Sequence, residues 1–113
     1  MTPEKKVQNE ILAEFGAKSW IKIWRVNVGV AIPLSAFHKD GLKARPIRYG
    51  TPGHSDIQGI VKPDGRSVFI EVKSATGRQS KEQIAFEKVM KSMGGIYILA
   101  RSTNAVSYTH LRA

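Results

Sequence analysis

Residues 56–73 read DIQGIVKPDGRSVFIEVK, two apolar runs that are interrupted by charged residues. Side chains in a strand have a period of two, so the second run places Glu71 and Lys73 on one face. Pro63-Asp-Gly65 supplies a turn between the runs, and a hairpin at this turn brings Asp56 near Glu71. Charges on a largely buried strand are costly unless they are paired or bind a ligand such as a metal ion. The stretch therefore predicts a charged site built on a β-hairpin.

The composition limits the size and class of the protein. Its 113 residues are enough for one small domain with one modest core. Its 18 lysines and arginines exceed its 9 acidic residues, and the formal charge of +9 favours a polyanionic partner such as nucleic acid, although ribosomal and membrane-surface proteins share this property. The absence of cysteine excludes a disulfide framework and a cysteine-ligated zinc site. With no membrane-spanning apolar run and no signal peptide, we expect a cytoplasmic protein without a membrane partner.

The order of the predicted elements is that of an α/β domain. A helix is predicted from Pro3 to about Gly16, because Thr2 can cap it and proline suits a first turn. The other elements are a strand over 20–28, the two strands of the hairpin, a second helix that begins with the capping box Ser80-x-x-Gln83 and ends at Gly94-Gly95, and a strand over Ile96–Ala100. We therefore expect the order helix, three strands, helix, strand, with a mixed four-stranded sheet flanked by the helices.

The domain is predicted to cover residues 1–105. Residues 106–113 have no readable period and resemble translated sequencing-adapter sequence, so we expect a non-native or unstructured tail. No function is assigned to this tail.

Residues 30–52 are the least regular part of the sequence. Ala31-Ile-Pro33 and Pro46–Tyr49 are candidate arms of an irregular hairpin, and Gly50-Thr-Pro-Gly53 forces a tight turn into Asp56. This turn lacks the Gly-Lys-Ser/Thr ending of a phosphate-binding P-loop, so no nucleotide cofactor is expected. Six basic residues of this segment and of the region after residue 73 are candidates to contact a nucleic-acid backbone: Lys39, Lys43, Arg45, Arg48, Arg78 and Lys81. The alternative is that such side chains are only solvated.

The first predicted helix carries a carboxylate on its apolar side. Val7, Ile11 and Phe15 form one stripe at about 100° per residue, and Glu4 falls inside this stripe. An inward carboxylate at the start of a helix indicates a third acidic ligand. The alternative is that Glu4 only complements the helix dipole in the first turn.

Asp56, followed by Glu71-x-Lys73 on the next strand, resembles the PD-(D/E)xK nuclease signature. A wider set of residues resembles the VRR-NUC branch of that superfamily: Arg25-x-Asn27-x-Gly29, Gly50-x-x-Gly53-x-x-Asp56, Gly59, Asp64-Gly65, Ile70-Glu-Val-Lys73, Gly77-Arg-Gln-Ser80, Gln83 and Gly94-Gly95. The resemblance runs from about Glu4 to Ala100. Ser55 departs from the signature, in which proline often precedes the aspartate, but the carboxylate remains in place.

The resemblance implies a restriction-endonuclease-like core with a metal site that holds one or two ions. The metal ligands would be Asp56, Glu71, the Val72 backbone carbonyl and, directly or through water, Glu4. Ligands that are all oxygen favour Mg²⁺ or Mn²⁺ over zinc. Lys73 would orient or deprotonate the attacking water, or stabilise the charge that builds up on the phosphorane.

Three further residues are implied as supporting groups. In the family a glutamine at the position of Gln83 lies beside the site and helps to position metal-bound water or the phosphate, and this role is compatible with capping the second helix. Arg25 and Asn27 would share a strand face, where they either support the site or touch the phosphate backbone, or are ordinary polar residues at the end of a strand.

The resemblance predicts a Mg²⁺-dependent endodeoxyribonuclease that selects branched DNA such as four-way junctions, of the kind used in phage or bacterial DNA repair. Symmetric cutting of a junction would require a homodimer with two sites. The alternatives are a nucleic-acid-binding module that does not cut, and a nuclease of the same chemistry with a restriction-type or RNA target.

Overall fold

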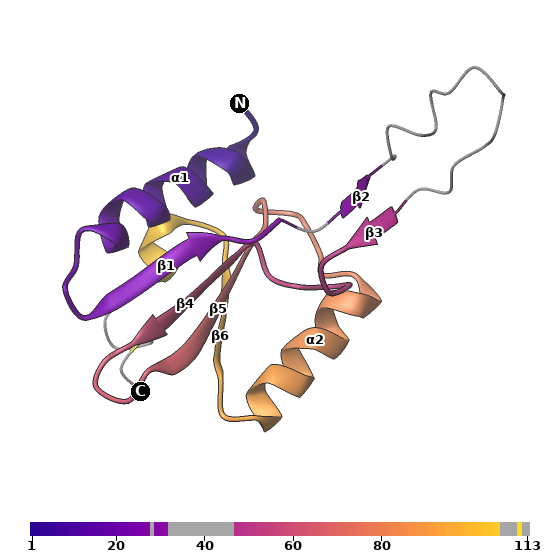
Figure 1. Cartoon of the computed structure of the whole chain (residues 1–113). Coiled ribbons are helices and arrows are strands. Elements are labelled where there is room, and N and C mark those ends of the chain that lie inside the picture. The colour runs from indigo at the N-terminus through magenta and orange to yellow at the C-terminus, as the bar shows by residue number, and fades with distance from the viewer. Residues whose placement is uncertain (28, 32–46, 107–110, 112–113) are drawn as a thin grey trace, which may run out of the picture.

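The computed structural model describes residues 1–27, 29–31, 47–106 and 111, with only the backbone described at 29–31 and 47–49. Its elements are α1 (Pro3–Gly16), β1 (Ile21–Arg25), β2 (Gly29–Ala31), β3 (Ile47–Tyr49), β4 (Ile57–Val61), β5 (Arg66–Val72), α2 (Lys81–Ser92), β6 (Ile96–Ala100) and the 3-10 turn η2 (Thr103–Ala105). The predicted α/β class is confirmed (Figure 1). Within the described residues, no helix has the length and apolar character needed to cross a membrane.

Four strands form a mixed sheet in the order β1, β4, β5, β6. β4 pairs antiparallel with both β1 and β5, and the predicted hairpin places Ile57 opposite Ile70. β6 lies parallel to β5. Two parallel neighbours need a crossover connection between them, and α2 supplies it. The predicted mixed four-stranded sheet is therefore confirmed.

Helix α1 covers one face of this sheet. The hydroxyl of Thr2 accepts a hydrogen bond from the Lys5 amide at 3.1 Å, as expected of the predicted cap. Ile11 and Phe15 are buried in the main core. From β5 the same core receives every second side chain: Val68, Ile70 and Val72.

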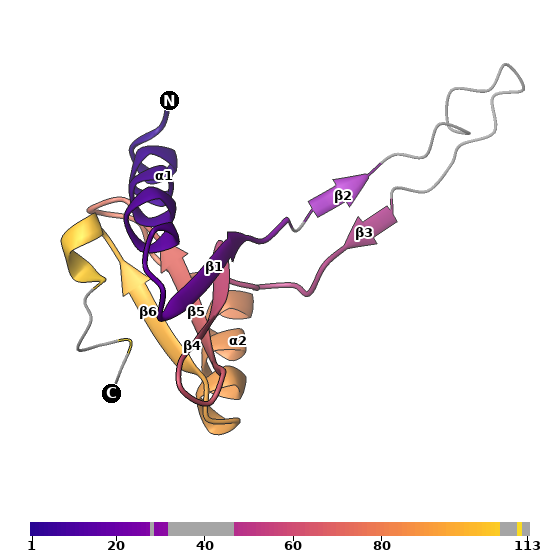
Figure 2. The ribbon, with the colours of Figure 1, turned by 60° about the vertical axis from the view of Figure 1, so that its left-hand side comes forward.

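Helix α2 lies on the opposite face of the sheet (Figure 2). Phe86 of α2 packs on Phe69 of β5 with ring centroids 5.4 Å apart, and the His54 ring lies 4.6 Å from that of Phe86. Side chains alternate along β5, so Glu71 projects on the same side as Phe69. The α2 side of the sheet is therefore the side that carries the predicted catalytic carboxylate.

β2 and β3 form a separate antiparallel ribbon that extends away from the four-stranded sheet (Figures 1 and 2). The predicted hairpin is present, but its first arm is 29–31 rather than 31–33. The strand predicted over 20–28 is shorter, Ile21–Arg25, because the chain then leaves the sheet for the ribbon. Of the four basic residues predicted to contact nucleic acid here, Arg48 lies in β3 and three lie outside the described residues: Lys39, Lys43 and Arg45.

The core extends past the predicted end of the domain at residue 105. Val106 is 5% exposed and Leu111 is 1% exposed, and both belong to the main core. The hydroxyl of Thr103 in η2 also donates a hydrogen bond to the Glu10 carboxylate of α1 at 2.6 Å. Two isolated apolar residues give no periodic signal in the sequence, yet they can fill space beside α1. Residues 107–110 and 112–113 lie outside the described residues, so the prediction of a non-native or unstructured tail stays a prediction.

Candidate active site

The β4–β5 hairpin brings Asp56 and Glu71 together. Because Ile57 lies opposite Ile70, the residues on either side of this pair, Asp56 and Glu71, also lie opposite each other and share the α2 face. The Asp56 Oδ2 atom accepts a hydrogen bond from the Val72 amide at 2.8 Å. The Glu71 carboxyl group is hydrogen-bonded to the Asp56 side chain. The predicted convergence of these two carboxyl groups is present.

Burial and the neighbouring carboxylate keep Glu71 protonated at neutral pH. Glu71 is only 2% exposed. Desolvation, followed by the hydrogen bond and the negative charge of Asp56, raises the pKa of Glu71 to about 9, while the Lys73 ammonium acts in the opposite direction. Without a cation, a hydrogen bond therefore joins the Glu71 and Asp56 side chains.

Lys73 and Glu4 lie at the border of this pair. Lys73 is half-buried just beyond β5, and its charge is close enough to favour ionisation of Glu71. The Glu4 Oε1 atom accepts a hydrogen bond from the Ser74 amide at 3.1 Å, and its charge disfavours ionisation of Glu71. In the part of the chain that the structure describes, no three His, Cys, Asp or Glu side chains converge as a metal-binding group. Glu4 is thus held by the loop after Lys73, and its predicted role as a metal ligand, directly or through water, stays a prediction.

The Gln83 side chain caps α2 and also contacts Glu71 of the candidate site. Its Oε1 atom accepts a hydrogen bond from the Ser80 amide at 2.8 Å, and the Ser80 hydroxyl accepts from the Gln83 amide at 3.1 Å, which together form a capping box. Its Nε2 atom donates to the Glu71 Oε2 atom at 3.2 Å. The start of α2 and the buried carboxyl are therefore fixed to each other.

The backbone of Val72 faces the Asp56 carboxylate. In a strand, the N–H and C=O groups of one residue point to the same neighbour. Since the Val72 N–H group donates to Asp56, the Val72 carbonyl is directed toward the same side, as its predicted ligand role requires. Two carboxyl groups and one carbonyl form an oxygen-only donor set that suits Mg²⁺ or Mn²⁺.

The other predicted residues lie around this centre. Arg25 donates to the side chains of Gln8 at 3.3 Å and Asn9 at 2.6 Å, so it fastens α1 to the end of β1. Asn27 lies beyond β1 and is exposed. The two basic residues predicted to contact nucleic acid after β5 are also exposed: Arg78 and Lys81. Arg25 is thus a supporting residue for the helix that carries Glu4.

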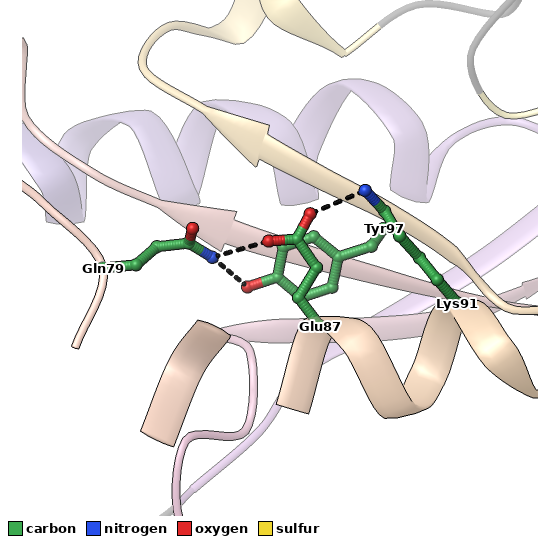
Figure 3. A network of polar contacts seen from close by, with 4 residues as sticks. All are labelled: Gln79, Glu87, Lys91 and Tyr97. Atoms are coloured by element: carbon green, nitrogen blue, oxygen red, sulfur yellow. Dashed lines mark hydrogen bonds and ion pairs between the residues drawn. The ribbon is translucent and has the colours of Figure 1, made fainter. Parts of the chain in front are cut away.

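A polar network beside the site was not predicted from the sequence (Figure 3). The Gln79 Nε2 atom donates to the Glu87 carboxylate and to the Tyr97 hydroxyl, both at 3.2 Å, and Glu87 pairs with Lys91 at 2.7 Å. Burial, and then the charge of Glu71, raise the pKa of Tyr97. Only the i, i+4 spacing of Glu87 and Lys91 could have been recognised in the sequence.

Arg101 also contributes to the surroundings of the site, and the sequence did not reveal its role. Its guanidinium donates to the backbone carbonyls of Ser74 at 2.5 Å and Gly77 at 2.7 Å. Together with the hydrogen bond from Ser74 to Glu4, these bonds fix the loop that follows Lys73.

No protein-family model matches this sequence. A search of curated proteins also finds no match. The function is therefore inferred from the motif and from the geometry of the residues that carry it.

Gly53 tests how closely α2 must approach the site. Its φ is 77°, and an added Cβ would overlap the backbone carbonyl of Glu82, next to Gln83. Gly65 has almost the same φ of 76° but nothing within 4 Å, so it is a matched control for backbone strain. We predict that Gly53→Ala lowers the free energy of unfolding by about 1–3 kcal/mol more than Gly65→Ala, because of overpacking. Urea denaturation measures both variants, and equal losses would contradict the contact.

The raised pKa of Glu71 predicts that the free energy of unfolding depends on pH when divalent cations are absent. The folded pKa of Glu71, about 9, exceeds its ordinary 4.5, so between these values the folded state binds more protons than the unfolded state. This contribution is complete below pH 4.5 and is lost as pH rises toward 9. Relative to Glu71→Gln, urea denaturation in EDTA should show wild-type stability falling by up to about 1.4 kcal/mol per pH unit. Parallel profiles of the two proteins would refute the assignment.

Proposed function

We propose that this chain is a divalent-cation-dependent endonuclease that hydrolyses DNA phosphodiester bonds and has a restriction-endonuclease-like core. The observation that supports this most is the pairing of Asp56 with the buried Glu71, with Lys73 beside them. A protein that only binds nucleic acid needs a basic surface and has no need of a buried pair of carboxyl groups. A buried carboxyl pair is costly, and perturbed carboxyl groups of this kind are concentrated at functional sites.

The donor set fits one divalent cation. Asp56, Glu71 and the Val72 carbonyl would hold it, and Glu71 would lose its proton on binding. A cation at this position supplies charge neutralisation for the scissile phosphate and a more acidic water.

The side chains around the pair have separate roles in the proposed reaction. The Val72 amide and the Gln83 side chain each hold one oxygen of a carboxyl group, so both ligands are oriented before substrate arrives. Lys73, as a half-buried ammonium, orients the attacking water or stabilises the charge on the phosphorane. Glu4 and Arg101 fix the loop that follows Lys73.

The proposed substrate is DNA, with branched DNA such as four-way junctions as the class that the motif favours. The formal charge of +9 supports a polyanionic substrate. Arg78 and Lys81 are exposed after β5, where they can contact phosphates near the site. A homodimer would place two such sites on one junction.

Cleavage of defined substrates tests the proposal. Four-way, flapped, linear and single-stranded DNA, with RNA controls, are incubated with the protein across Mg²⁺ and Mn²⁺ titrations. We expect cation-dependent cutting of DNA, with branched forms preferred, and a loss of about 100-fold or more in Asp56→Asn and Lys73→Ala because ligand and charge stabilisation are removed. Met93→Ala, at the C-terminal end of α2 and 80% exposed, is the control.

The contrary outcomes are distinct. Wild-type protein that binds DNA but leaves every substrate intact would make the chain a non-catalytic binding module. Preferential cutting of RNA, or of one DNA sequence regardless of branching, would retain the chemistry and replace the substrate.

A further inference from the structure

Helix α2 leaves part of its sheet face exposed. It packs through Phe86 on Phe69 of β5, whereas β1 and β4 present Trp24, 45% exposed, and Ile60, 44% exposed, on the same face. Residues directly opposite in a ladder share a face, and Gln58 lies opposite both Trp24 and Phe69. Lys22 lies opposite Ile60 and is exposed. We name this surface the β1–β4 strip: Lys22, Trp24, Gln58 and Ile60.

The β1–β4 strip is continuous with the carboxylate pair. The Val26 amide donates to the Asp56 carbonyl at 2.8 Å, so the β1–β4 pairing continues to the residue that carries the carboxylate. In this pairing Asp56 lies opposite Val26. Because Trp24 lies two residues before Val26, Asp56 is the diagonal neighbour of Trp24 on the same face, with about 8 Å between their backbone positions. Glu71 lies one strand further along the same row as Asp56. The indole thus stands beside the proposed site and not behind it.

The chemistry of the strip suits an unpaired nucleotide. It combines an exposed indole and an isoleucine with a lysine, and none of its four side chains is acidic. Its far end opens into a hollow of about 310 Å³, whose lining includes Trp20, Ile60 and two lysines, Lys22 and Lys62. Aromatic rings that stack on bases, beside lysines that neutralise phosphates, characterise surfaces that bind single strands.

We propose that Trp24 stacks on an unpaired base of the DNA substrate, next to the bond held at Asp56 and Glu71, while Lys22 contacts the backbone of the same strand. This inference rests on the proposed nuclease function and, among branched DNA substrates, favours flapped forms with an unpaired arm over four-way junctions, in which all bases are paired. A base inside a duplex is already stacked on both faces and has none to offer to a ring on a sheet. The strip therefore distinguishes a flap or overhang from fully paired DNA.

The test compares Trp24→Leu with Trp24→Phe in the full chain. Leucine keeps an apolar side chain and removes the ring, whereas phenylalanine keeps a ring that can stack. Fluorescence anisotropy in EDTA measures binding to a duplex with a single-stranded arm and to the same duplex with blunt ends. We expect Trp24→Leu to bind the armed duplex about tenfold or more weakly with unchanged blunt-duplex binding, and Trp24→Phe to stay within about threefold of wild type. Met93→Ala should match wild type on both.

Three outcomes would overturn the inference. Armed-duplex binding that is equal in Trp24→Leu and wild type would show that the ring does not stack on the substrate. An equal loss on armed and blunt duplexes would show that Trp24 does not sense an unpaired base. A change of molar mass in light scattering, from dimer in wild type to monomer in Trp24→Leu, would make the strip a contact between two copies of the chain.

The same experiment separates this inference from the nuclease proposal. Binding is measured without divalent cations and does not depend on cleavage. A ring-dependent preference for armed DNA in a protein that never cuts would sustain the role of Trp24 and refute the enzyme. Cation-dependent cutting, together with unchanged binding by Trp24→Leu, would support the enzyme and refute the role of Trp24.

Discussion

The register of β4 against β5 is the constraint on which the site depends. With Ile57 opposite Ile70, the carboxyl groups of Asp56 and Glu71 are adjacent on one face. A slip of one residue would send one of them into the apolar core, because side chains alternate between faces. The packing of β5 against α1 opposes that slip, because the slip would move Val68 and Ile70 out of the core to the other face of the sheet. The packing that folds the domain therefore also assembles its carboxyl pair.

The helices contribute orientation more than they contribute charge. Helix α2 approaches so closely at Gly53 that Gln83 can cap the helix and hold Glu71 at once. Helix α1 is fastened to β1 by Arg25, and its Glu4 holds the loop after Lys73. Among the described residues, every buried side-chain nitrogen or oxygen atom has a hydrogen-bond partner, as a low-dielectric site requires.

Local signals in the sequence predicted most of the fold and the centre of the site. Thr2 and the Ser80–Gln83 box mark the two helix starts, and alternation over β5 separates Val72 from Glu71. These features depend on neighbours in sequence. The contacts of Arg101 and the burial of Leu111 depend on distant chain segments, so no local pattern encodes them. The exposure of Trp24 was equally hidden, because alternation assigns it to a face without revealing that α2 stops short of it.

Proton release on cation binding tests the central claim most directly. Isothermal titration calorimetry with Mn²⁺ at pH 7, in two buffers that differ in ionisation enthalpy, counts the protons that leave the protein. Because Glu71 has a pKa of about 9 and must ionise to become a ligand, wild type should release about one proton per bound ion, and Glu71→Gln should release none and bind more weakly. Binding without proton release, or undiminished in Glu71→Gln, would contradict a proton-sharing pair that a cation replaces.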